Sequence, residues 1–109
     1  MDRGKMKRLE KAGWTVGTVA QFVDLTKVEE ALVGIKAALA EELRRTRMRG
    51  RLTQAELAKR MGSSPSRVAK MEAGHPSVSL DLLVHGLLVA GATRQDIASV
   101  IGKASLPTA

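Results

Sequence analysis

Residues 52–74 read LTQAELAKRMGSSPSRVAKMEAG, and this stretch decides the fold because it encodes two short helices and the turn between them. Thr53 and Glu56 have the capping-box spacing, in which each side chain satisfies an otherwise unbonded amide at a helix start. The first helix is therefore predicted to begin there and to end at Gly62. A serine followed by Pro65 supplies a cap and a proline at the first helical position, so a second helix is predicted to follow directly.

The rest of the chain is predicted to be helical as well, because apolar residues recur at intervals of three and four and no stretch alternates as a strand does. A capping box at Thr26 and Glu29 predicts a long helix to about Met48, whose apolar stripe is Leu25, Val28, Leu32, Ile35, Leu39 and Leu43. Two more helices are predicted after Ser79 and Thr93. We expect an all-α fold with an arm at 1–25, a five-helix domain at 26–102 and a tail at 103–109.

The composition fits one globular domain, since the 109 residues are 44% hydrophobic and 27% charged. The 18 lysines and arginines outnumber 11 acidic residues and give a net charge of +7, so we expect a polyanionic partner, first of all nucleic acid. The absence of cysteine excludes disulfides and thiol nucleophiles. No apolar run reaches the roughly 18 residues of a membrane span, and no secretory signal is present, so we expect a cytoplasmic protein without a membrane partner.

The second helix of the quoted stretch presents a polar face. At about 100° per residue, its buried direction lies between Val68 and Met71, so Ser66 and Lys70 point outward. Arg67 and Glu72 lie at the boundaries of that buried direction on the same helical wheel. Two helices joined by a tight turn are the geometry that places a second helix in the DNA major groove, where serine, arginine and lysine bond to base edges. The alternative is a solvated basic face.

Residues 52–74 resemble the helix-turn-helix of the phage-repressor, xenobiotic-response-element (XRE) family, and the later helices fall where that family's five-helix fold has them. The resemblance implies that Gln54 binds phosphate and that residues at the positions of Pro65, Ser66 and Lys70 face bases. Pro65 departs from relatives with a glutamine there, so base reading is expected to shift to Ser66, Arg67 and Lys70. The family also implies a structural ion pair between Arg47 and Glu72.

The expected partner is double-stranded DNA with a near-palindromic operator, bound by a homodimer whose reading helices lie about one duplex turn, roughly 34 Å, apart. The residues expected to contact the DNA backbone are Arg51, Gln54, Ser63, Ser64 and Pro65. Arg51 ends a run of five arginines within residues 44–51, which has the alternative interpretation of a solvated, cation-favouring helix end.

The segment from Lys11 to Thr26 is similar to the amino-terminal extension of some HigA-type antitoxins. This likeness implies that the chain neutralises a small RelE/HigB-like ribonuclease toxin and represses its own promoter. Two alternatives stay open, namely a stand-alone XRE-type repressor and a protein-interaction module that does not read DNA. The aromatic residues Trp14 and Phe22 are expected to pack onto the helical body, and the alternative is an exposed patch that binds a partner.

No residue is expected to have a catalytic or metal-binding role. The chain lacks the G-x-S-x-G, G-x-x-x-x-G-K and H-E-x-x-H motifs, and it has neither cysteine nor tyrosine. His75, between a glycine and a proline, is expected in a loop, and His85 in the middle of a helix. Their separation does not fit a metal site. We therefore expect a protein that is not an enzyme and has no cofactor.

Overall fold

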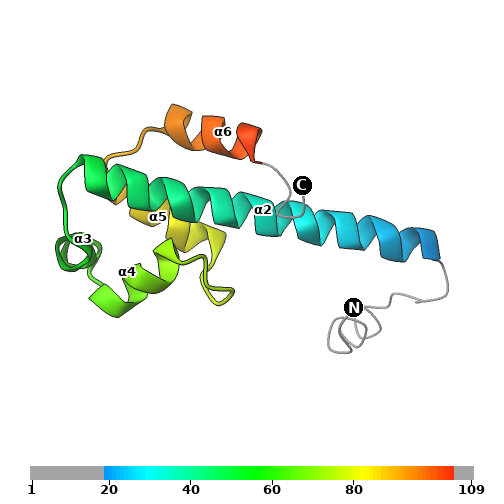
Figure 1. Ribbon diagram of the computed structural model, residues 1–109, viewed down its shortest axis with the longest axis horizontal. Helices are drawn as coiled ribbons and strands as arrows, with labels where there is room; N and C mark the ends of the chain where they lie inside the picture. Colours follow the sequence, from blue (N-terminus) through cyan, green and yellow to red (C-terminus); the bar gives the residue numbers. More distant parts are fainter. Residues whose placement is uncertain (1–18, 105–109) are drawn as a thin grey trace.

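The computed structural model describes residues 19–104, with side chains from residue 26 onward. This part of the chain contains five helices and no strand, as Figure 1 shows: α2 (Val19–Arg49), α3 (Gln54–Met61), α4 (Pro65–Glu72), α5 (Leu80–Ala90) and α6 (Arg94–Lys103). The prediction of an all-α, five-helix fold is confirmed. Trp14 and most of the predicted arm and tail lie outside the described residues, so the predicted division into arm, domain and tail stays a prediction.

The start of the long helix was predicted wrongly. Helix α2 begins at Val19 rather than near Thr26, so residues 19–25 of the predicted arm belong to this helix. Thr26 and Glu29 have the spacing of a capping box but lie inside the helix, where the backbone amides are already bonded along the helix. Residues 19–33 contain neither glycine nor proline, and nothing in that stretch interrupts the helix.

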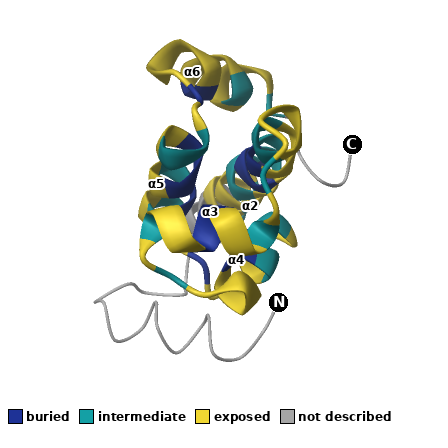
Figure 2. Cartoon of the chain, turned by 90° about the vertical axis from the view of Figure 1, so that its left-hand side faces the viewer, coloured by how far each residue is buried: buried dark blue, intermediate teal, exposed yellow. Residues whose placement is uncertain are grey.

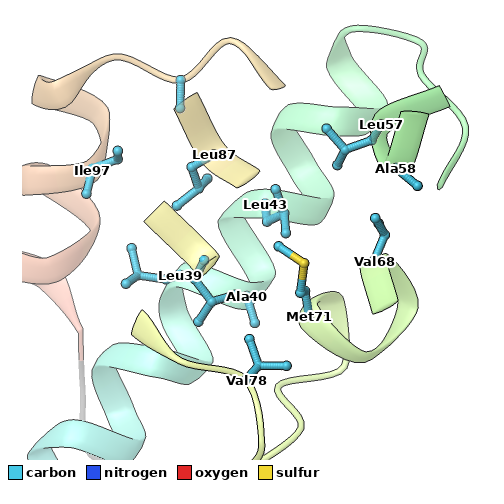
Figure 3. Packing of buried hydrophobic residues seen from close by; sticks show 12 residues of the cluster. Leu39, Ala40, Leu43, Leu57, Ala58, Val68, Met71, Val78, Leu87 and Ile97 are labelled. Carbon is cyan, nitrogen blue, oxygen red and sulfur yellow. The ribbon is translucent and has the colours of Figure 1, made fainter. Parts of the chain in front are cut away.

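The core forms where α2 packs against α4, α5 and α6, with α3 packed on α4 and α5. Leu39 and Leu43 of α2 are fully buried, and Met71 of α4 and Leu87 of α5 are buried with them. Figure 3 shows these side chains pointing toward one another across the helices. Gly86 of α5 allows the close approach, because a Cβ at this position would lie 2.7 Å from the Met71 methyl group and 3.4 Å from Leu43.

The N-terminal half of α2 extends beyond the other helices (Figure 1). Its predicted apolar stripe continues there, but Val28 is 55% exposed and Leu32 is 40% exposed. Val33 beside them is 53% exposed. The side chain of Leu25 is outside the described residues. The stripe therefore packs on the core from Ile35 onward, and its earlier part is an exposed apolar face.

The predicted helix starts after residue 50 are borne out in detail. Thr53 caps α3 in a complete capping box with Glu56, and Ser79 and Thr93 cap α5 and α6. The backbone N–H of Thr53 donates to the Glu56 carboxylate at 3.1 Å. This bond, with that from the Thr53 side chain, lowers the pKa of Glu56 below its usual value because it favours the ionised form.

Candidate nucleic-acid interface

The turn between α3 and α4 is as short as the sequence predicts. Gly62 takes a left-handed conformation, with φ of 67°, which glycine adopts without strain. The amide of Ser63 donates to the carbonyl of Ala58 at 2.8 Å and closes the end of α3. Ser64 then caps α4, its hydroxyl accepting from the amide of Arg67 at 3.3 Å. Three residues, 62–64, thus separate the end of α3 from the start of α4.

The outer face of α4 is polar and exposed. Val68 and Met71 are buried on its inner side, whereas Ser66, Arg67 and Lys70 are exposed. In Figure 2, α4 carries exposed residues on its outer side and lies at the surface of the molecule. Neither Arg67 nor Lys70 forms an ion pair with a described residue. The structure therefore leaves two cations without an ion pair among the described residues, and an exposed hydroxyl, on one face of one helix.

A hollow of about 300 Å³ lies beside this face, and sequence reasoning did not predict it. It is lined by Ser64, Ser66, Arg67, Lys70, Ser77, Val78 and Leu82. Ser77 comes from the loop before α5, where its amide and hydroxyl contact Nδ1 of His75 at 3.1 and 2.7 Å. His75 is in a loop, as predicted. No spacing along the chain indicates that Ser77 lines the same hollow as residues of α4, because this depends on how the segment between α4 and α5 folds.

The residues of the turn that are expected to contact the DNA backbone differ in how far they are buried. Ser64 and Pro65 are exposed at the start of α4, and the Ser64 hydroxyl also lies 3.2 Å from that of Ser66. The hydroxyl oxygen of Ser63, in contrast, is buried and has no hydrogen-bond partner among the described atoms. The turn buries this oxygen although Ser63 as a whole is half-buried, and the expectation that Ser63 contacts phosphate stays a prediction.

Arg47 and Glu72 join the end of α2 to the end of α4. Nε of Arg47 donates to Oε2 of Glu72 at 2.5 Å, and Nη2 donates to Oε1 at 3.0 Å. The side chains are 13% and 5% exposed, so the pair is shielded from water. The hydrogen bond to Glu72 raises the pKa of the Arg47 guanidinium above its already high value. A third bond, from Nη1 to the carbonyl of Leu52 at 2.8 Å, holds the turn after α2.

Arg51 is the one described residue other than glycine with a positive φ, at 55°. It occupies the left-handed position after α2, where the amide of Leu52 donates to the carbonyl of Arg47 at 3.1 Å. Gly50 precedes this position. A left-handed conformation at a non-glycine residue costs roughly 1–2 kcal/mol. The structure therefore keeps an exposed arginine where glycine would be less strained.

Three of the five arginines in residues 44–51 form ion pairs within the protein, and two form none with a described residue. Arg45 pairs with Glu41 at 2.6 Å and Arg49 pairs with Glu42 at 2.8 Å. Arg47 is bound to Glu72. Within residues 26–104, Arg44 and Arg51 form no ion pair. A phosphate-contacting role for the run therefore stays a prediction, and Arg51 is one of its members that has no ion pair among these residues.

Gln54, the first residue of α3, is half-buried rather than fully exposed. Its Nε2 donates to Oε1 of Glu72 at 3.2 Å. The sequence did not predict this contact, because the two residues are 18 positions apart in different helices.

Among residues 26–104, no group of three or more histidine or acidic side chains is placed to hold a metal ion. No described helix is long and apolar enough to cross a membrane.

Of the comparisons with known proteins, the one with family models gives a match that includes this geometry. No curated protein and no solved structure shows significant similarity to the chain. The family model of a helix-turn-helix domain matches residues 38–100, which are more than half of the chain and include α3 and α4. The match supports the resemblance to an XRE-like family and does not extend to the HigA-type antitoxins. The chain belongs to the helix-turn-helix domain family.

Proposed function

We propose that this protein is a transcription regulator, not an enzyme, which binds duplex DNA in a sequence-specific way through α4. The carrying observation is the outer face of α4, where Ser66, Arg67 and Lys70 are exposed and the two cations are free of ion pairs with described residues. Arginine and lysine donate to guanine O6 and N7 in the major groove, and serine bonds to most base edges. Helix α3 and the exposed Arg51 precede α4 along the chain and supply contacts to the DNA sugar-phosphate backbone.

The DNA complex is proposed to contain two copies of the chain on a near-palindromic operator. A single eight-residue reading helix contacts only a few base pairs, and two-fold related copies double the site. Their α4 helices are then expected about one duplex turn apart, which is roughly 34 Å.

Selection from a pool of random duplexes tests this function. We expect the wild-type protein to enrich a motif with two inverted half-sites. Arg67→Ala and Lys70→Ala should each reduce discrimination against mismatched duplexes by about 1–3 kcal/mol. Arg94→Ala and Lys103→Ala, on exposed positions of α6, remove the same charges away from α4 and serve as matched controls. Failure to enrich any motif would contradict the proposal.

We further propose that the protein is the cytoplasmic antitoxin of a toxin-antitoxin pair. The exposed apolar face of α2, formed by Val28, Leu32 and Val33, supports a protein partner, because adjacent large aliphatic side chains at a surface are typical of interaction sites. Glu29 lies within this face, and it forms no ion pair with a described residue. A small ribonuclease toxin, with the basic surface that RNA binding requires, matches both the apolar and the acidic part.

Co-expression with the product of the neighbouring reading frame tests the antitoxin role. We expect a stable complex, neutralised ribonuclease activity and loss of both in Leu32→Asp, with DNA binding retained. Leu88→Asp introduces the same charge at an exposed leucine of α5 and is the matched control. A neighbouring frame that encodes no ribonuclease, or a complex unaffected by Leu32→Asp, favours the stand-alone repressor. Complex formation without any DNA binding favours the protein-interaction module.

A further inference from the structure

One carboxylate connects three helices at the edge of the proposed DNA-binding surface. Glu72, at the end of α4, accepts two hydrogen bonds from Arg47 of α2 and one from the Gln54 amide of α3. The Glu72 side chain is 5% exposed, so its position is fixed by the protein rather than by water. Gln54 is half-buried and lies at the start of α3, on the helix that precedes the reading helix.

The chemistry of Glu72 determines which end of the Gln54 amide faces inward. The two ends of a glutamine amide have almost the same shape, but one is an acceptor and the other carries two donors. An ionised carboxylate only accepts, so it selects the nitrogen end. Of the two hydrogens on Nε2, one is used by Glu72, and the second is left for a ligand. A phosphate oxygen is an acceptor, so this hydrogen suits it.

Glu72 does not need Gln54 for its own satisfaction. Arg47 already donates to both carboxylate oxygens, at 2.5 and 3.0 Å. The contact from Gln54, at 3.2 Å, is the longest of the three. The bond is therefore not required to satisfy Glu72, whereas it restricts the Gln54 side chain, which would otherwise sample several rotamers and both amide orientations.

We propose that Glu72, held in place by Arg47, is a positioning residue that orients the Gln54 amide to donate to a DNA phosphate. The inference rests on the proposed function, because it requires duplex DNA as the ligand. It gives Glu72 a role in DNA binding in addition to its role in holding α2 against α4. Gln54 contacts DNA, and Glu72 acts through Gln54.

A double-mutant cycle on DNA affinity tests the proposal with Gln54→Ala, Glu72→Gln and the variant that combines them. Glu72→Gln keeps the shape and an acceptor for Arg47, but its amide no longer selects the nitrogen end of Gln54. The probe is the duplex selected by the wild type, followed by fluorescence anisotropy. Each single change should weaken binding about tenfold, the size of one hydrogen bond to a charged group, and the combined variant should be no weaker. Gln95→Ala, at an exposed glutamine of α6, should have no effect.

Single methylphosphonate substitutions in the duplex give a readout that a merely structural role of Glu72 would not change. For the wild type, we expect one neutralised phosphate per half-site whose affinity loss disappears in Gln54→Ala and also in Glu72→Gln. Circular dichroism at the binding temperature verifies that each variant is folded. If Glu72→Gln is unfolded, Arg47→Met combined with Glu72→Leu replaces the ion pair by apolar side chains and takes its place in the cycle.

The outcomes separate this inference from the proposed function. Additive losses in the cycle, or a phosphate profile that Glu72→Gln leaves unchanged, overturn the positioning role while DNA binding stands. A wild-type protein that binds no duplex overturns the proposed function and this inference together.

Discussion

Removing one partner of the Arg47–Glu72 pair is expected to destabilise the fold strongly. In Glu72→Ala, the Arg47 guanidinium loses both carboxylate bonds and keeps only the carbonyl of Leu52. Since Arg47 is 13% exposed, water replaces those bonds poorly. Breaking a buried ion pair by removing one side typically costs about 3–5 kcal/mol. A small domain has about 5–15 kcal/mol of stability in total, so this is a large fraction of it.

The assay is urea denaturation followed by circular dichroism at 222 nm, with a thermal scan beside it. At about 4–8 °C per kcal/mol for a domain of this size, the unfolding midpoint of Glu72→Ala should fall by roughly 12–40 °C. Arg47→Met should have a similar effect, because it leaves a carboxylate that is 5% exposed without its cation. Combining Arg47→Met with Glu72→Leu should restore most of the stability, since an apolar pair needs no hydrogen bonds.

Arg45 offers a matched control on the same helix. Its pair with Glu41 has side-chain exposures of 62% and 64%, so Arg45→Met should cost less than about 1 kcal/mol. The reasoning would be refuted if Glu72→Ala and Arg45→Met had equal effects, or if the combined Arg47 and Glu72 variant were as unstable as the sum of its single changes.

Three other perturbations have defined expectations. Arg51→Gly should relieve the left-handed backbone strain and raise the free energy of unfolding by about 1 kcal/mol, and unchanged stability in urea would contradict the strain. The same change should weaken DNA binding and reduce the salt dependence of the affinity by about one phosphate contact. Leu43→Ala should cost about 2.7–5.0 kcal/mol by the same assay, because Leu43 is fully buried, and a cost below 1 kcal/mol would contradict its place in the core. The lowered pKa of Glu56 means that its stabilising effect is present above the unfolded pKa of this carboxyl and is lost as the pH falls through the lower folded pKa. Glu56→Gln should therefore flatten that acid-side decline, and an unchanged pH profile of stability would contradict the capping bond.

The features that the sequence predicted well are those governed by local chemistry. Thr53, Ser64, Ser79 and Thr93 each cap the helix that follows, because a cap needs only its own side chain and an amide three residues later. The outward direction of Lys70 likewise follows from helical geometry once Val68 and Met71 are taken as buried.

The features that the sequence did not predict depend on tertiary contacts, or on whether a residue interrupts the helix before a capping pattern. Thr26 and Glu29 have capping spacing, but the same spacing occurs inside helices, and only an interruption before Thr26 would have made it a start. Periodicity placed Val28 and Leu32 on the apolar face of α2 and contained no information about whether another helix covers them. The bond from Gln54 to Glu72 joins two helices, and no spacing along the chain indicates it.

Methylation interference on the selected duplex tests most directly whether the outer face of α4 enters the major groove. Dimethyl sulfate modifies guanine at N7 in the major groove and adenine at N3 in the minor groove, so one reagent probes both grooves. We expect N7 methylation at the guanines of each half-site to abolish binding and N3 methylation to leave it unchanged, with the N7 effect lost at one guanine in Lys70→Ala. Binding that tolerates every N7 methyl group but fails with N3 methyl groups would contradict the account.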